Sequence, residues 1–190
     1  YQDSMAEVPQ KVIDVFSGKR LLMRDSLCSY ILLSYESKCY YYLNRMEDAF
    51  RTNRKVIRYC TDHASLDRSR ALLAEALNNQ GVYWQEQGER DSAISVLKSA
   101  VDILQTTRKR SVLTSVYMNL ADSYLQKGDY SWCGFYYRRA LFVADSLGIG
   151  YRDYFAIYSG LAKLYLELEN FPEANEYFVK AEQIDHLCTP

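Results

Sequence analysis

The sequence has few of the residues that sharp turns, disulfides and membrane spans require. Of its 190 residues only 3 are Pro and 8 are Gly, too few for the many turns of an all-β sandwich. The 5 cysteines are scattered, odd in number and without a C-x-x-C pair, so we expect small buried thiols and no disulfide framework. No apolar run approaches the ~18 residues that a membrane-spanning helix needs. The chain is therefore expected to fold as one mostly helical domain, 1–190, that does not insert into a membrane.

Signals for catalysis, metal binding and nucleic-acid binding are also scarce. The formal net charge is −1, which gives no electrostatic reason to expect nucleic acid, and the one basic run, Arg108 to Arg110, is interpreted as a solvated link between helices. Only 2 histidines are present, and there is no phosphate-binding loop and no G-x-S-x-G motif. Cys60 and His63 are three residues apart but lack the second pair of ligands that a zinc site needs. We predict no catalytic activity, no metal, no cofactor and no contact with nucleic acid.

The N-terminus leaves the compartment open. The first ten residues, YQDSMAEVPQ, do not have the pattern of a signal peptide. Because the chain does not begin with Met, we expect a fragment of a longer protein from which a signal or anchor has been removed or separated. Free thiols favour a reducing compartment but also occur in exported proteins, so cytoplasmic and periplasmic locations both fit.

A segment of 20 residues recurs along the chain. Its copies are GVYWQEQGERDSAISVLKSA (81–100), ADSYLQKGDYSWCGFYYRRA (121–140), AKLYLELENFPEANEYFVKA (162–181) and, more weakly, SKCYYYLNRMEDAFRTNRKV (37–56). Each copy opens with a small residue, has an aromatic residue three positions later, and continues through a turn to a second small residue. The last positions of successive copies are 44, 40 and 41 residues apart. Small residues let two helices approach closely, which explains why Gly81 is kept despite a cost of about 1 kcal/mol in a helix.

This pattern resembles the tetratricopeptide repeat, a helix-turn-helix unit with small and aromatic residues at the same spacing. The resemblance covers Ser29 to Ile184 and implies an all-α fold, a right-handed superhelix of about four helical hairpins in which the stacking of neighbours creates the core. A period near 40 is similar to that of bacterial regulators and sensors. A preceding half-repeat, whose helix is expected to start at Pro9, would cap the stack. The expected divisions are a cap at 1–23 and repeats at 24–62, 66–107, 110–148 and 150–187.

The resemblance also implies a binding surface, because the first helix of each repeat lines the concave side of such a stack. The candidate partner-binding residues at groove-facing positions are Tyr35, Lys38, Tyr42, Asn78, Asn79, Met118, Asn119, Asp122, Ser159 and Lys163. Asn79 and Asn119 occupy the same repeat position, where peptide-binding members of the family use Asn to bond the backbone of an extended peptide. The alternative is that these Asn side chains are solvated or bond to a neighbouring helix. Tyr35, Tyr42 and Met118 are expected to add apolar contact, and the two lysines to hold an acidic end.

These observations predict a non-enzymatic module that binds a protein or peptide segment in its concave groove. The long period and the many tyrosines are similar to the sensor or interaction domains of bacterial signalling and transcription-regulatory proteins. The family's clamp for a C-terminal carboxylate is not expected, because Ser34 and Ser115 stand where the clamp needs larger polar or basic side chains. The alternative function is a structural scaffold that self-associates without a peptide ligand.

Overall fold

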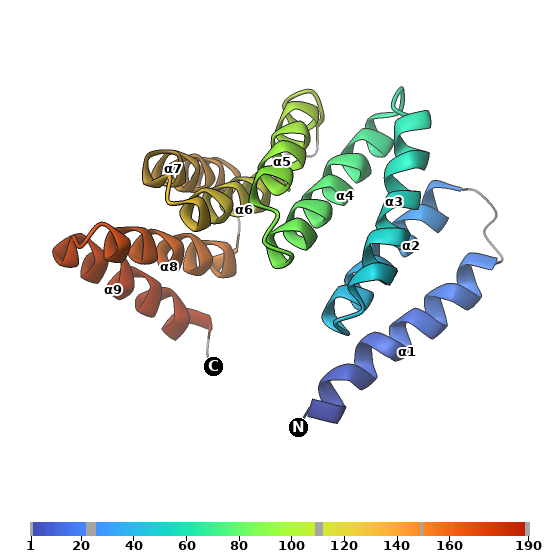
Figure 1. Ribbon diagram of the computed structural model, residues 1–190, viewed down its shortest axis with the longest axis horizontal. Coiled ribbons are helices and arrows are strands. Elements are labelled where there is room, and N and C mark those ends of the chain that lie inside the picture. Colours follow the sequence, from blue (N-terminus) through green and yellow to red (C-terminus); the bar gives the residue numbers. More distant parts are fainter. Residues whose placement is uncertain (1, 22–25, 109–111, 149, 189–190) are drawn as a thin grey trace.

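The computed structural model describes residues 2–21, 26–108, 112–148 and 150–188, with backbone alone at 2–7, 20–21 and 186–188. These residues form nine α-helices and no strand (Figure 1). In chain order the helices are α1 (Gln2–Leu21), α2 (Leu27–Tyr42), α3 (Met46–Asp62), α4 (Asp67–Glu86), α5 (Arg90–Gln105), α6 (Val112–Lys127), α7 (Tyr130–Leu147), α8 (Tyr151–Glu167) and α9 (Phe171–Cys188). The predicted all-α fold is confirmed.

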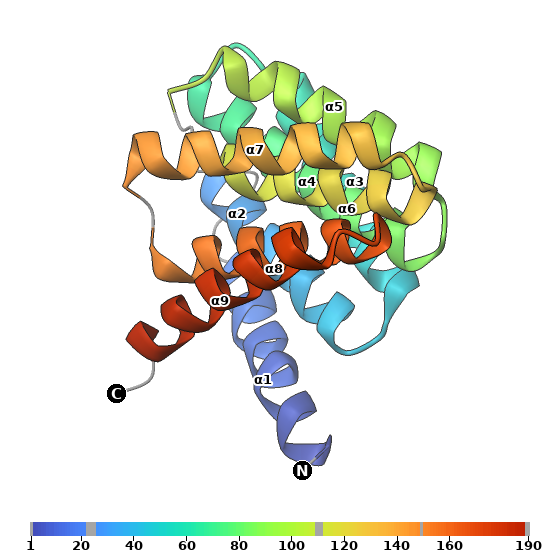
Figure 2. The same cartoon turned by 90° about the vertical axis from the view of Figure 1, so that its left-hand side faces the viewer.

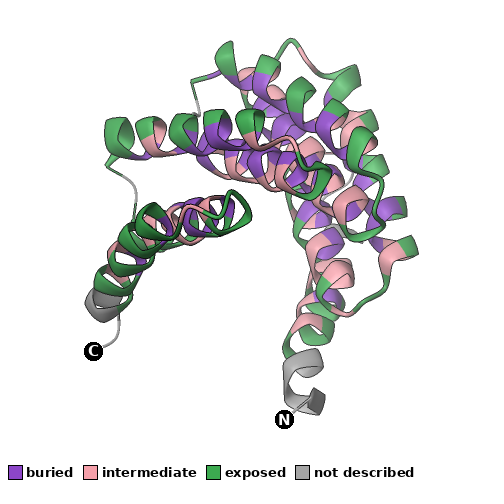
Figure 3. Ribbon diagram, turned by 60° about the vertical axis from the view of Figure 1, so that its left-hand side comes forward, coloured by how far each residue is buried: buried purple, intermediate pink, exposed green. Residues whose placement is uncertain are grey.

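The helices pair in sequence order and the pairs stack into a superhelical arch (Figures 1 and 2). The four hairpins are α2 with α3, α4 with α5, α6 with α7, and α8 with α9, while α1 packs on α2. First helices of neighbouring hairpins also touch, α2 with α4, α4 with α6, and α6 with α8, whereas among the described residues the backbones of the second helices do not come close to one another. The first helices therefore lie on the inner side of the arch seen in Figure 3. The division of the chain into a cap and four repeats stays a prediction.

The turn inside each hairpin places one residue in the left-handed backbone region. These residues are Asn44, Gly88, Gly128 and Glu169, with φ of 56°, 78°, 78° and 55°. They recur at the spacing of the sequence repeat, so the same turn is built four times. Glycine adopts this conformation without steric cost, Asn tolerates it, and Glu does not favour it.

Close helix approach explains the small residues of the repeat. The first small residue of each copy is buried, as are Ala49, Ala93, Cys133 and Ala174 at the second small position. A Cβ at Gly81 would lie 2.5 Å from Cγ of Leu97, so α4 and α5 could not keep their separation with a larger residue there. The packing explanation of Gly81 is confirmed.

Two local expectations from the sequence are wrong. Pro9 does not start a helix but lies inside α1, because the preference of Pro for the first helical turn does not prevent a helix from extending further upstream. Cys28 is exposed, in contrast to the buried Cys60 and Cys133, because it lies in the first turn of α2 beside an open hollow. Burial raises the pKa of both buried thiols to about 12, which makes them unreactive.

Candidate functional site

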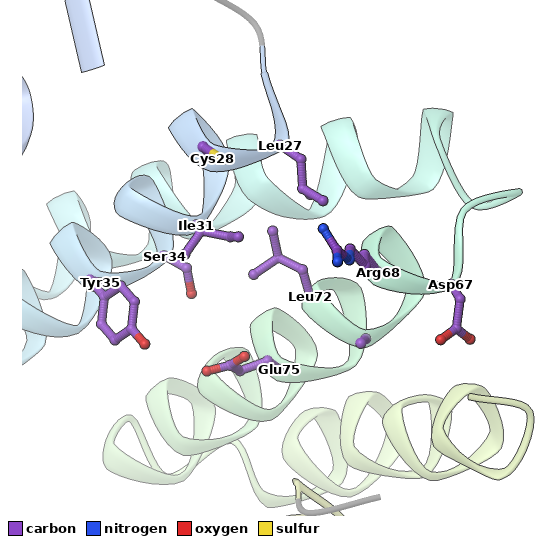
Figure 4. A pocket seen from close by; sticks show the side chains of 10 residues that line it. Leu27, Cys28, Ile31, Ser34, Tyr35, Asp67, Arg68, Leu72 and Glu75 are labelled. Atoms are coloured by element: carbon purple, nitrogen blue, oxygen red, sulfur yellow. The ribbon is translucent and has the colours of Figure 1, made fainter. Parts of the chain in front are cut away.

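The inner face, defined here as the surface formed by α2, α4, α6 and α8, contains two hollows. The first, the α2–α4 pocket, has a volume of about 390 Å³. Its walls are largely apolar and its polar groups come from both helices (Figure 4). It is lined by Leu27, Cys28, Ile31, Ser34, Tyr35, Asp67, Arg68, Ala71, Leu72 and Glu75. Of the predicted site residues only Tyr35 lies here, where its ring is 49% exposed.

Lys38 lies next to this pocket but its charge is already matched. Its Nζ is 3.2 Å from Oε1 of Glu75 on the neighbouring first helix and lies 5.5 Å from the centre of the Tyr35 ring. The ammonium group therefore joins α2 to α4 across the inner face. Tyr42, at the last position of α2, is 74% exposed and lines neither hollow.

Two asparagine side chains, Asn78 and Asn119, meet in the middle of the inner face. Nδ2 of Asn119 donates to Oδ1 of Asn78 over 2.9 Å, which links α6 to α4. Among the described residues the other two amide atoms, Nδ2 of Asn78 and Oδ1 of Asn119, have no hydrogen-bond partner, and both side chains are partly exposed. The Asn78–Asn119 pair therefore presents one donor and one acceptor to the groove.

Asn79 differs from its neighbour. It is buried, at 7% exposed, and its Nδ2 has no hydrogen-bond partner. Asn79 and Asn119 share a repeat position, but the corresponding residues are Tyr35 in the first hairpin and Gly160 in the last. Repeat position alone therefore does not determine whether a side chain reaches the groove.

The second hollow, the α6–α8 pocket, gathers five of the predicted site residues. It has a volume of about 310 Å³. Its lining is Met118, Asn119, Asp122, Tyr137, Ala156, Ser159, Gly160 and Lys163. The structure thus brings together Met118, Asn119, Asp122, Ser159 and Lys163, which are up to 45 positions apart in the chain.

The carboxyl group of Asp122 dominates the electrostatics of the α6–α8 pocket. Burial raises the pKa of this carboxyl above its usual range, while the hydrogen bond from the Tyr137 hydroxyl and the charge of Lys163 act in the opposite direction. Burial beside Asp122 in turn raises the pKa of the Tyr137 hydroxyl, so Tyr137 stays protonated and donates. The exposed Lys163 ammonium adds a cation at the edge of the pocket.

Known proteins resemble the chain in one repeat of its sequence and in its fold. The family model described as tetratricopeptide repeat matches residues 114–141, from α6 into α7. Among the solved structures, the repeat folds described below superpose on nearly the whole chain. One repeat of the chain therefore matches the tetratricopeptide-repeat family model, and the fold is that of tetratricopeptide-repeat solenoids. No curated protein matches the sequence.

Three solved structures illustrate this fold. A signal transduction ATPase with numerous domains and a tetratricopeptide repeat sensor, from Pyrococcus horikoshii, is 22% identical over 82% of this chain and 24% of that one, with a TM-score of 0.68. A tetratricopeptide repeat protein of Thermus thermophilus is 18% identical over 92% and 90%, with a TM-score of 0.57. Aspartyl phosphate phosphatase F of Bacillus subtilis is 15% identical over 95% and 60%, with a TM-score of 0.58. The chain spans about a quarter of the length of the archaeal protein.

The outer side of the chain carries an aromatic cluster that the sequence analysis missed. Trp132, Phe135 and Tyr136 of α7 lie with ring centres 5.1 to 5.9 Å apart. Nζ of Lys98 on α5 lies 6.0 Å from the Trp132 ring. The spacing of the three aromatic residues at i, i+3 and i+4 was the available signal, because it places them on one face of a helix. The ammonium group of Lys98 already forms a cation–π contact with this cluster.

The part of the chain that the structure describes meets the requirements of neither a metal site nor a membrane-spanning helix. No group of three or more metal-ligating side chains occurs there, and none of the described helices is both long and apolar enough to cross a bilayer. Nδ1 of His63 lies 2.8 Å from the carbonyl oxygen of Tyr59, in the preceding turn of α3. Of the basic run at 108–110, only Arg108 is described, and it is exposed.

Proposed function

We propose that the chain is a non-enzymatic module that binds an extended segment of a partner protein along its inner face. The observation that carries this proposal is the free donor and acceptor of the Asn78–Asn119 pair, which links α4 to the edge of the α6–α8 pocket. A peptide group has one donor and one acceptor, so this pair can bond the backbone of a segment whatever its sequence. A protein partner is also what a tetratricopeptide-repeat fold generally serves.

The length of the inner face sets the length of the segment. Packed helices lie about 8–10 Å apart, so the path from α2 to α8 covers roughly 25–30 Å. An extended chain advances about 3.3 Å per residue, which corresponds to about eight residues. We expect an apolar side chain of the segment near the α2–α4 pocket and a polar or charged one near Asp122 and Lys163.

We further propose that this binding serves a sensor or interaction domain of a bacterial signalling or regulatory protein. The support is the likeness of the fold to the archaeal signal transduction ATPase, whose description gives its tetratricopeptide repeats as a sensor. In such an arrangement, capture of the partner segment on the inner face would change the contacts of a neighbouring domain.

The test uses a peptide library of about eight variable residues displayed against the folded chain. Selected peptides are then titrated against the chain and against the Asn78→Ala/Asn119→Ala variant. Loss of hydrogen bonds to the peptide backbone should weaken binding by about 1–3 kcal/mol, for peptides of unrelated sequence alike. Asn175→Ala, an exposed Asn on the second helix α9, is the matched control and should bind as the wild type does.

Two results would count against the groove. Selected peptides that bind the double variant as tightly as the wild type would show that the Asn78–Asn119 pair does not bond the peptide. Weakening by Asn175→Ala to the same degree would place binding on the outer side. Circular dichroism of each variant confirms that the comparison is made between folded proteins.

The alternative function, self-association, is favoured by one observation on α9. Its Phe171, Phe178 and Val179 side chains are 65%, 45% and 42% exposed, and the first two are seven positions apart, on one face of the helix. A scaffold that assembles through this face would sediment as a dimer or larger species, and Phe178→Ser would return it to a monomer. A mass that stays monomeric as concentration rises would exclude this function.

A further inference from the structure

The α2–α4 pocket contains a polar group that the fold does not satisfy. The side chain of Ser34 is 3% exposed and its Oγ has no hydrogen-bond partner. Figure 4 shows Ser34 among the residues that face the pocket, between Tyr35 and Leu72. A buried hydroxyl without a partner costs about 1–3 kcal/mol, and a ligand with a polar group at this depth would remove that cost.

The walls around Ser34 suit an apolar body. Leu27, Ile31 and Leu72 project into the space from α2 and α4, and the ring of Tyr35 closes one side (Figure 4). The volume of about 390 Å³ falls in the range of roughly 300–1,000 Å³ typical of small-molecule sites. A single aromatic ring with a short chain fits such a space.

The charges around the pocket leave one cation in excess. The carboxylate of Asp67 is 3.1 Å from Arg70, and Glu75 is paired with Lys38. Among the described residues no carboxylate pairs with Arg68. In Figure 4 the nitrogen atoms of Arg68 extend toward Leu27 and Leu72, whereas the Asp67 carboxylate is directed away from them.

We propose that the α2–α4 pocket binds a small amphipathic carboxylate. Its carboxylate pairs with the Arg68 guanidinium, whose planar fork suits a carboxylate. Its apolar body lies against Leu27, Ile31 and Leu72, and a polar group at its far end bonds Oγ of Ser34. The ligand is a free molecule rather than the protein segment proposed above, and it competes with the apolar side chain that the segment would place near this pocket.

The experiment titrates the full chain with four probes by calorimetry and by NMR. The probes are 3-(4-hydroxyphenyl)propionate, 3-phenylpropionate, 3-phenylpropanamide and 3-phenylpropylamine, which vary one group at a time. We expect saturable binding of both acids, about tenfold weaker binding of the amide because it loses a charge-assisted hydrogen bond, and no binding of the amine. The phenol should bind more tightly than the plain phenyl acid.

Two variants assign the contacts. Arg68→Gln should bind the acid and the amide equally, and Ser34→Ala should lose the preference for the phenol while keeping the preference for the acid. Ser34→Ala removes a buried hydroxyl that bonds nothing in the fold, so we expect it to fold normally. Arg54→Gln, an exposed arginine on α3, is the matched control and should bind all probes as the wild type does.

Three outcomes overturn the proposal. They are the absence of saturable binding by either acid, equal binding of acid and amine, and an acid preference that survives Arg68→Gln. Competition with a peptide selected on the inner face separates the two functions. If the peptide shifts the NMR signals of the pocket residues and neither acid does, the pocket serves the protein segment and the small-molecule site is excluded. If the acids bind and no peptide does, the proposed function fails while this site stands.

Discussion

The first hairpin and the three later hairpins are held together by different means. From α4 to α8 the buried side chains form one continuous apolar cluster, from Ala74 to Leu164. In the first hairpin the apolar core is split into a cluster around Val56 and a smaller one around Phe50. Buried polar residues lie between them, including Ser37 and Asn53, both fully buried.

Hydrogen bonds replace apolar contacts at these positions. Nδ2 of Asn53 donates to the carbonyl oxygen of Ala76 over 2.8 Å, across from α3 to α4. Oγ of Ser37 donates to the carbonyl oxygen of Ala49 over 2.9 Å and lies 2.8 Å from the hydroxyl of Tyr83. The first copy departs from the repeat pattern at Asn53, and the structure compensates for the departure in part: Nδ2 is hydrogen-bonded, whereas the buried Oδ1 has no hydrogen-bond partner. Weak sequence similarity therefore does not imply weak packing.

A large effect is expected where the later hairpins pack most closely. A Cβ at Gly160 would lie 2.2 Å from Cζ of Tyr137, a buried ring that cannot move aside. Gly160→Ala should destabilise the chain by about 1–3 kcal/mol, even though Ala gains about 1 kcal/mol of helix propensity. Urea unfolding measures the change.

Gly134→Ala is the control for this prediction. Gly134 is also a buried glycine inside a helix, but its nearest neighbour to an added Cβ, Cδ2 of Leu164, lies 3.2 Å away. This variant should stay within about 1 kcal/mol of the wild type because the propensity gain offsets mild crowding. Equal effects at the two glycines would show that close packing does not distinguish these positions.

A second prediction concerns the polar core of the first hairpin. Asn53→Ala removes the bond to Ala76 and leaves a small void, and should cost about 1–3 kcal/mol. Asn175→Ala, at an exposed position of α9, should change the free energy of unfolding by less than about 0.5 kcal/mol. If Asn53→Ala were as neutral as its control, the first hairpin would not depend on buried hydrogen bonds, and the comparison drawn here would fail.

The smallest effect is expected at the turns. Glu169 holds a left-handed conformation with φ of 55°, which costs roughly 1–2 kcal/mol for a residue with a side chain. Glu169→Gly removes this steric cost, but glycine loses more backbone freedom on folding than other residues do, which offsets part of the gain. The net stabilisation should be about 0.5–1 kcal/mol. Asn44→Gly should gain less, since Asn tolerates this region. Thermal unfolding that ranks the two variants the other way would contradict the turn argument.

The sequence pointed to more residues of the α6–α8 pocket than of the α2–α4 pocket. Five of its residues converge in the α6–α8 pocket, since groove-facing positions follow directly from the helical period. The α2–α4 pocket was anticipated only through Tyr35, because nothing in the sequence near Arg68 shows that Asp67 pairs with Arg70 and Glu75 with Lys38. The bond between Asn78 and Asn119 joins two helices, and the sequence analysis left such a bond as one of several alternatives.

The repeat, the helices and the turns can be predicted from the amino-acid sequence, because each depends on residues within one copy or on the spacing between copies. Gly81 and the turn glycines act through their own backbone and their immediate neighbours. Which polar groups are paired and which have no partner depends instead on how the helices pack. Ser34 and Arg68 line the same pocket because α2 and α4 lie side by side. That packing also determines whether a polar side chain has a hydrogen-bond partner. Local chemistry repeats along this chain, whereas its candidate binding surface depends on contacts between copies that differ in sequence.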